Sequence, residues 1–261
     1  MSKHKLTEAF QAVQNKDKKA FVPYIMAGDG GLAALKDQLL YLQEIGVTAA
    51  EIGIPFSDPV ADGPVIQEAG KRALAHGVTL RGVLDYLAAH KEAITIPIIL
   101  MTYLNPVIQY GAESFAEDSH KAGVSGVIIP DMPLEEEVEV SEALKKNDLA
   151  LIRLVTLTSP EERVAKITDG AEGFIYAVTV KGTTGVRTSY QDDVASYLQR
   201  IKAKSPVPVL AGFGVSSKEQ AEELSRHCDG VIVGSKIVEL FHKGQREEIK
   251  QLFPHAAVSA N

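Results

Sequence analysis

AAEIGIPF, residues 49–56, is one of eight short apolar runs that recur along this chain of 261 residues. Each run contains β-branched or aromatic residues, and most are continuously apolar instead of alternating with polar residues. Strands buried on both faces of a parallel sheet have this composition. The eight runs are Ala20–Gly28, Ala49–Phe56, Ile96–Tyr103, Gly126–Pro133, Leu149–Thr156, Gly173–Val180, Val207–Val215 and Gly230–Val238.

Stretches with helical spacing separate these runs. Within residues 31–46, for example, leucines recur at helical intervals and Gly46 follows as a stop signal. Eight strand–helix units without a low-complexity linker predict one (β/α)8 barrel, the TIM barrel, as a single domain over residues 1–261. Lys5–Asn15 predicts an extra N-terminal helix under the barrel. A doubly wound open sheet is the alternative, but Gly28-Asp29-Gly30-Gly31 does not match its G-x-G-x-x-G fingerprint.

The overall composition excludes several classes of function. A formal net charge of -7 argues against nucleic acid as a partner, because phosphate backbones recruit basic surfaces. The single cysteine, Cys228, cannot form an intrachain disulfide. The first residues lack the apolar core of a signal peptide, and no apolar run approaches the ~18 residues of a membrane span. We therefore expect a cytoplasmic protein without a membrane segment.

Acidic residues mark the end of the second apolar run. Glu51 lies inside this run, where burial in a barrel lumen would raise its pKa toward neutral pH. A carboxyl group with such a pKa is suited to transfer protons. A buried structural glutamate with a partner is the competing interpretation. Asp58 and Asp62 follow in a Pro-rich loop, and each taken alone is more typical of a turn.

Glycines cluster after the last three runs, at the end of the barrel where this fold binds phosphate. Glycine lets backbone N–H groups approach an anion closely. Tight turns without a ligand would also use glycine. The three clusters are Lys181–Gly185, Gly212–Gly214 and Gly234-Ser235.

Aromatic and apolar residues at the same end would suit a flat aromatic substrate, although barrel packing explains most of them equally well. They are Phe21, Tyr24, Leu100, Tyr103, Tyr176 and Phe213. The sequence has no HExxH motif, cysteine cluster or G-x-S-x-G motif, so we expect no metal and no serine nucleophile. Acid–base carboxylates beside a phosphate site indicate proton-transfer or carbon–carbon chemistry on a small phosphorylated molecule.

The run from Glu51 to Gln67, EIGIPFSDPVADGPVIQ, closely resembles the signature of the tryptophan synthase alpha chain family. The resemblance extends along the chain through Phe21–Tyr24, Met101–Pro106 and Pro130–Pro133 to the three glycine clusters. It implies a lyase that splits indole-3-glycerol phosphate into indole and glyceraldehyde-3-phosphate, in tryptophan biosynthesis.

The resemblance also implies a role for each matched residue. Glu51 matches the general acid–base, and Asp62 matches the carboxylate that stabilises positive charge on the indole nitrogen. Tyr176 and Thr184 match substrate-contacting residues. The matched phosphate-binding residues are Gly185, Gly214, Gly234 and Ser235, and those of the indole pocket are Phe21, Leu100 and Phe213.

The resemblance further implies a partner, a beta chain that carries pyridoxal phosphate and receives indole through a tunnel. The alpha chain itself would need no cofactor, and the complex would be an α2β2 heterotetramer. Segments 55–62, 105–106 and 130–133 match the surface that faces the beta chain.

Three other functions stay open at this point. Lys181 could act as the nucleophile of a Schiff-base aldolase on a sugar phosphate. The chain could instead be a non-catalytic activator of a beta chain, although such a protein would not need both Glu51 and Asp62. It could also produce indole without a beta chain.

Overall fold

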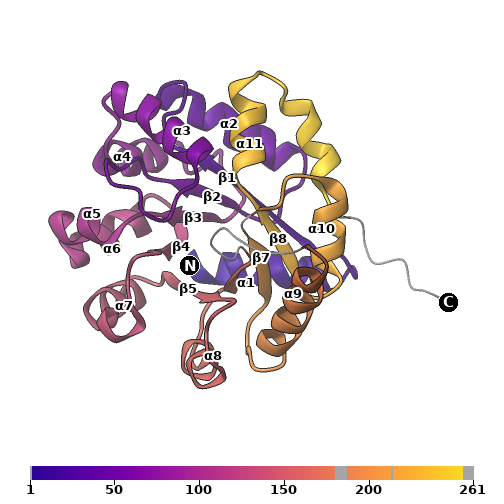
Figure 1. The fold of residues 1–261 in the computed structure, drawn as a ribbon. Coiled ribbons are helices and arrows are strands. Elements are labelled where there is room, and N and C mark those ends of the chain that lie inside the picture. Colours follow the sequence, from indigo (N-terminus) through magenta and orange to yellow (C-terminus); the bar gives the residue numbers. More distant parts are fainter. Residues whose placement is uncertain (1, 180–186, 213, 255–261) are drawn as a thin grey trace.

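The eight apolar runs form eight parallel strands that close into a barrel (Figure 1). The computed structural model describes residues 2–179, 187–212 and 214–254. Each strand pairs with the next, and β8 pairs with β1. The predicted (β/α)8 barrel is therefore confirmed. The strands are β1 Ala20–Met26, β2 Ala50–Gly53, β3 Ile98–Met101, β4 Val124–Ile128, β5 Ala150–Thr156, β6 Ile175–Val178, β7 Val209–Gly212 and β8 Gly230–Val233.

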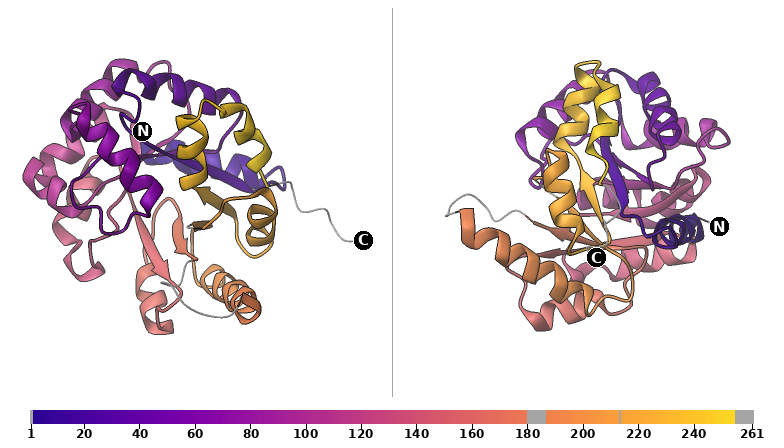
Figure 2. Two further views of the ribbon diagram at one scale, coloured as in Figure 1. Left: turned by 45° about the horizontal axis from the view of Figure 1, so that its top comes forward. Right: turned by 90° about the vertical axis from the view of Figure 1, so that its right-hand side faces the viewer.

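Helices surround the barrel and cover the outer faces of the strands (Figure 2). Local signals set several helix starts: Ser217 accepts a hydrogen bond from the backbone N–H of Gln220, Thr79 accepts one from Gly82, and Pro64 opens α3. The outer helices are α2 Leu32–Glu44, α3 Pro64–Ala75, α4 Leu80–His90, α5 Leu104–Tyr110, α6 Ala112–Lys121, α7 Val138–Lys146, α8 Glu161–Thr168, α9 Arg187–Lys202, α10 Lys218–Ser225 and α11 Ser235–His242, with 3-10 turns η1 Leu134–Glu136 and η2 Arg246–Leu252.

The extra N-terminal helix is present as α1, Ser2–Gln14, drawn in indigo in Figure 2. Its Leu6 and Phe10 side chains are buried, and the Phe10 ring lies 5.5 Å from that of Phe174, just before β6. A Cβ atom added to Gly173 would meet both Leu6 and the β5 residue Ile152. The helix thus closes the end of the barrel where the strands begin.

Strand register decides which side chains face the barrel interior. Residues paired across parallel strands point to the same face, and the next residue along points to the other. Tyr24 pairs with Glu51, and Gly53 with Met101. Tyr24 and Glu51 interact electrostatically with Tyr176 of β6, which lies across the barrel, so this set faces the lumen.

None of the helices in the described ranges is long and apolar enough to cross a membrane.

Candidate active site

Glu51 lies on β2 with its carboxyl group in the lumen, and only 1% of its surface is exposed. Its Oε2 atom is buried, and no hydrogen-bond partner for it occurs in the described part of the chain. Burial disfavours the charged form, and the negative charge of Asp62 adds to this effect. Together they raise the pKa of Glu51 to about 8. Glu51 therefore holds a proton at neutral pH that it can transfer.

Asp62 lies in the loop between β2 and α3, on the C-terminal side of the strands. Its backbone N–H donates to the Pro59 carbonyl at 3.1 Å, and its own carbonyl accepts from the Gln67 side chain at 2.9 Å. Burial raises the pKa of the Asp62 carboxyl to about 6, against a hydrogen bond from Tyr103 that lowers it. The two carboxyl groups thus differ in proton affinity, as a paired acid and base require.

Three tyrosines surround the two carboxyl groups. Tyr24 comes from β1, Tyr103 follows β3 and Tyr176 comes from β6, and all three are buried. Burial and the negative charges of Glu51 and Asp62 raise the pKa of Tyr24 and Tyr176. These phenols stay protonated and can donate hydrogen bonds to a substrate.

Two glycines make room for these rings. A Cβ atom at Gly53 would lie 1.8 Å from the Tyr24 hydroxyl oxygen, and one at Gly212 would lie 2.4 Å from the Tyr176 ring. Both glycines are the last residues of their strands, β2 and β7. The tyrosine rings consequently occupy space that any larger residue would fill.

Gly234 and Ser235 lie at the start of α11, directly after β8. Backbone N–H groups and the helix dipole make such a position favourable for an anion. Gly234 lies close to the lumen, because a Cβ atom there would be 3.7 Å from Cβ of Tyr24. Gly214 follows β7 and has a positive φ of 82°. These residues lie at the same end of the barrel as the carboxyl groups.

The structure corrects the prediction for two pocket residues. Phe21 precedes Tyr24 by three positions and pairs with Val231, so it faces the surrounding helices, where its ring stacks on Phe253 at 4.3 Å. Leu100 pairs with Ile52, which neighbours Glu51 and points to the opposite face. Both miss the lumen because side-chain direction reverses at every strand residue.

Tyr24 and Met101 occupy the lumen positions instead. Tyr24 appeared among the aromatic candidates in the sequence without a role, and Met101 did not appear as a site residue. Strict alternation would have separated Tyr24 from Phe21, but a continuous apolar run carries no such signal. Three further predicted residues, Thr184, Gly185 and Phe213, lie outside the described residues.

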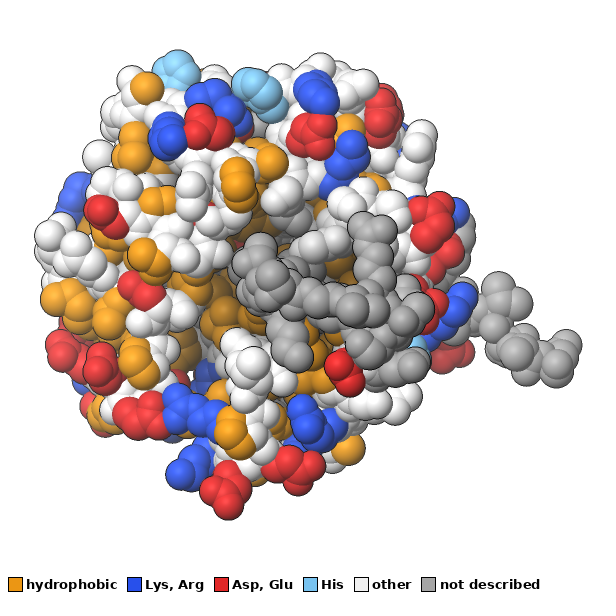
Figure 3. Space-filling view, in the orientation of Figure 1, with side chains coloured by type: hydrophobic (Ala, Val, Ile, Leu, Met, Phe, Trp, Pro, Cys, Tyr) orange, Lys and Arg blue, Asp and Glu red, His pale blue; other side chains and the backbone are white. Residues whose placement is uncertain are grey.

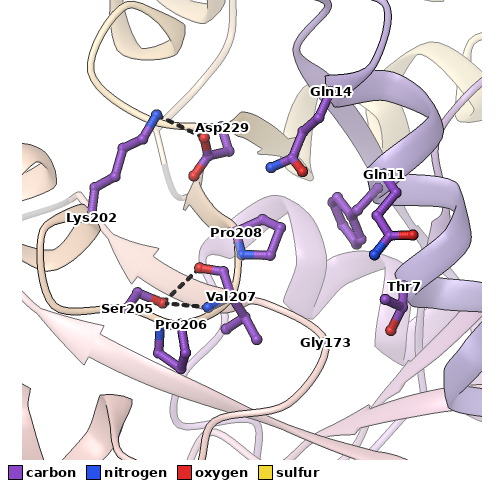
Figure 4. A pocket seen from close by; sticks show the side chains of 11 residues that line it. Thr7, Gln11, Gln14, Gly173, Lys202, Ser205, Pro206, Val207, Pro208 and Asp229 are labelled. Carbon is purple, nitrogen blue, oxygen red and sulfur yellow. Dashed lines mark hydrogen bonds and ion pairs between the residues drawn. The ribbon is translucent and has the colours of Figure 1, made fainter.

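The hollow at this end of the barrel is visible in Figure 3, where apolar side chains line a depression near the middle of the molecule. A different pocket, of about 360 Å³, lies at the opposite end, between α1 and the residues that precede β7 and β8 (Figure 4). Its walls include Gln11, Gln14 and the Lys202–Asp229 ion pair at 2.7 Å. Active sites of this fold lie at the C-terminal ends of the strands, so we assign the chemistry to that end of the barrel and not to this pocket.

A model of the tryptophan synthase alpha chain family matches residues 10–260. The chain belongs to this family. It is 53% identical over 242 residues to the alpha chain of Bacillus thuringiensis subsp. konkukian, an alignment that covers 93% of this chain and 94% of that one. It is equally identical, at 53% over 245 residues, to that of Bacillus cereus (strain ATCC 14579), with 94% and 95% covered.

Solved structures of family members have the same fold. The tryptophan synthase of M. tuberculosis, open form, superposes with a TM-score of 0.85 at 33% identity, covering 95% of this chain and 96% of that one. The alpha subunit from Legionella pneumophila str. Paris superposes with a TM-score of 0.84 at 34% identity, covering 95% of each chain.

Family membership assigns the reaction. The chain is a carbon–carbon lyase that cleaves indole-3-glycerol phosphate to indole and glyceraldehyde-3-phosphate in tryptophan biosynthesis. Alpha chains of this family need no cofactor, and pyridoxal phosphate is carried by the beta chain, the partner that the family implies. The described residues contain no group of three or more His, Cys, Asp or Glu side chains that could hold a metal ion.

Proposed function

We propose that Glu51 and Asp62 together carry the proton chemistry of this lyase reaction. Glu51 starts protonated and gives its proton to C3 of the indole ring. The ring becomes an iminium-like electron sink, and the positive charge on its nitrogen faces the Asp62 carboxylate. The observation that supports this assignment is the pair of buried carboxyl groups whose pKa values, about 8 and about 6, lie on either side of neutrality.

The carbon–carbon bond then breaks. Glu51, now ionised, takes the proton from the hydroxyl on the side-chain carbon attached to C3. The oxygen forms the aldehyde of glyceraldehyde-3-phosphate, and the bonding electron pair returns to the ring to give neutral indole. Glu51 finishes protonated, as it began, so protons and electrons balance over the cycle.

The remaining site residues bind the substrate. Gly214, Gly234 and Ser235, with Gly185, hold the phosphate through backbone N–H groups and the α11 dipole. Tyr176, with Thr184 and Phe213, contacts the indole and glycerol portions. Tyr24 and Met101 replace Phe21 and Leu100 as walls of the pocket. Residues 1–261 act as one domain.

We also infer an α2β2 heterotetramer in the cytoplasm. Val60 lies in the loop after β2 with 80% of its surface exposed, and Ile108 lies in α5 with 53% exposed. These exposed apolar side chains are available for burial against a partner chain. They belong to or adjoin segments 55–62 and 105–106, which resemble the beta-facing surface of the family.

Glu51→Gln and Asp62→Asn test the assignment. Each amide keeps the shape of the side chain but cannot transfer the proton or carry the charge. We expect indole release from indole-3-glycerol phosphate to fall by about a hundredfold to ten-thousandfold in each variant, alone and with a beta chain. Glu113→Gln, at an exposed ion pair with Lys146, is the matched control and should retain full activity. Normal release by either active-site variant would refute the role of that residue.

A further inference from the structure

Tyr103 bridges to two neighbouring residues of the loop that carries Asp62. The Ala61 backbone N–H donates to the Tyr103 hydroxyl oxygen at 3.1 Å, and the same hydroxyl interacts electrostatically with the carboxyl group of Asp62, the next residue of the loop. Only 2% of Tyr103 is exposed, and its ring lies 5.3 Å from the ring of Phe56 at the start of the loop. A single phenol therefore ties the backbone of this loop to the end of β3, directly beside the Asp62 carboxyl group.

Tyr103 is itself held firmly. It is the N-cap residue of α5, and the backbone N–H of the next residue, Leu104, donates to Asp131 at 2.9 Å. Asp131 lies beyond β4, so two neighbouring strands fix the position of the phenol. The Asp62 loop, in contrast, reaches the surface at Val60, and its own backbone bonds join residues close in sequence. The tyrosine is thus the fixed side of the contact, and Asp62 is the side that is positioned.

We propose that Tyr103 is a positioning residue of the lyase reaction, whose hydroxyl, through its hydrogen bond with the Ala61 backbone, holds the adjacent Asp62 carboxylate at the lumen wall, facing the indole nitrogen. This inference rests on the proposed role of Asp62. It adds a residue that does not itself exchange a proton with the substrate.

The surroundings of Asp62 explain why such a donor is needed. The described titratable groups that interact with its carboxyl group are Glu51, Tyr24, Tyr103 and Tyr176, and none of these four is a cation. Burial raises the pKa of Asp62, and the bond from Tyr103 is the interaction that lowers it. Without the hydroxyl, Asp62 would take up a proton at higher pH and would lose the charge that offsets the iminium.

Tyr103→Phe removes the hydroxyl and keeps the ring. We expect kcat for indole release to fall roughly ten- to a hundredfold, the usual effect of losing a hydrogen bond to a charged group, with a smaller change in KM. The acid limb of the pH–kcat profile should move to higher pH. Tyr197→Phe is the matched control, since Tyr197 is equally buried in α9 and donates to the Val155 carbonyl at 2.6 Å outside the lumen.

The double variant Asp62→Asn/Tyr103→Phe separates positioning from general support of the fold. If Tyr103 acts through Asp62, the double variant should be no slower than Asp62→Asn alone. Independent losses that multiply, or an unmoved acid limb in Tyr103→Phe, would overturn the proposal, as would a profile identical to that of Tyr197→Phe. Full activity of Asp62→Asn would instead refute the role of Asp62 itself. The single Asp62→Asn variant therefore distinguishes a failure of the proposed function from a failure of the role of Tyr103.

Discussion

Gly53 is the residue that lets a tyrosine stand beside Glu51. The Tyr24 hydroxyl oxygen lies 1.8 Å from the place where a Cβ atom of residue 53 would be. That distance is far below van der Waals contact, so any other residue at 53 forces the ring to move. Tyr24 on β1 interacts with the carboxyl group of Glu51 and lies next to Gly234 of the proposed phosphate site. A displaced ring would therefore change the surroundings of both residues.

We predict that Gly53→Ala destabilises the protein and impairs indole release. Overpacking of a filled site costs about 1–3 kcal/mol in the free energy of unfolding, measured by urea denaturation. The double variant Gly53→Ala/Tyr24→Leu removes the overlapping ring atoms and should recover part of that stability. If the stability losses of Gly53→Ala and Tyr24→Leu simply added up in the double variant, the alanine would not act through Tyr24.

Helix α3 determines where the Asp62 loop ends. Gly63 and Pro64 start the helix immediately after Asp62. Arg72, near its C-terminal end, forms two hydrogen bonds to Asp29 at 2.7 and 2.8 Å, which tie the helix to the loop after β1. The position of the carboxylate thus depends on a helix whose C-terminal part is tied to the loop after β1.

Gly70 lies in the interior of α3, where glycine has a low helix propensity. We predict that Gly70→Ala stabilises the protein. Alanine in a helix interior is favoured over glycine by about 0.5–1 kcal/mol. The added Cβ atom would meet only the Met26 methyl group, at an ordinary 3.6 Å. The free energy of unfolding from urea titration measures the gain.

Gly77, just beyond the same helix, provides the contrast. Its surroundings are also open, but its φ is 70°, a conformation that disfavours alanine. Gly77→Ala should therefore destabilise the protein. If the two alanine variants shifted stability in the same direction, backbone conformation would not be the cause.

At the scale of the whole molecule, burying Glu51 costs stability once it ionises. Its folded-state pKa of about 8 exceeds the ordinary value of 4.5, so the folded protein binds more protons than the unfolded chain between these values. Stability from this group is complete below pH 4.5 and is lost as the pH rises through about 8. The loss is on the order of a few kcal/mol.

Glu51→Gln should remove this pH dependence. We predict that the variant is more stable than the parent chain near pH 9 and differs less from it near pH 5, as measured by urea midpoints at both values. Asp62→Asn should show a smaller effect of the same sign, because the pKa of Asp62 is raised only to about 6. A parent chain whose stability did not fall between these pH values would contradict the buried, protonated state of Glu51.

The sequence by itself determined the barrel, its added N-terminal helix and the acidic residues of the lumen. These features are local: a continuous apolar run predicts a strand buried on both faces, and a 3.6-residue period predicts the helix that follows it. Glu51 was identifiable because a carboxyl group within such a run is unusual. The family motif around it extended the prediction to Asp62.

Only the tertiary structure decided which side chains share the lumen. Phe21 and Tyr24 belong to one apolar run, as do Leu100 and Met101, and nothing in a continuous run says which residue points inward. The register of the closed eight-stranded barrel decides this, because residues paired across adjacent strands point to the same face of the sheet. The contact of Tyr103 with Asp62 likewise depends on β2 and β3 lying side by side, since the two residues are distant along the chain.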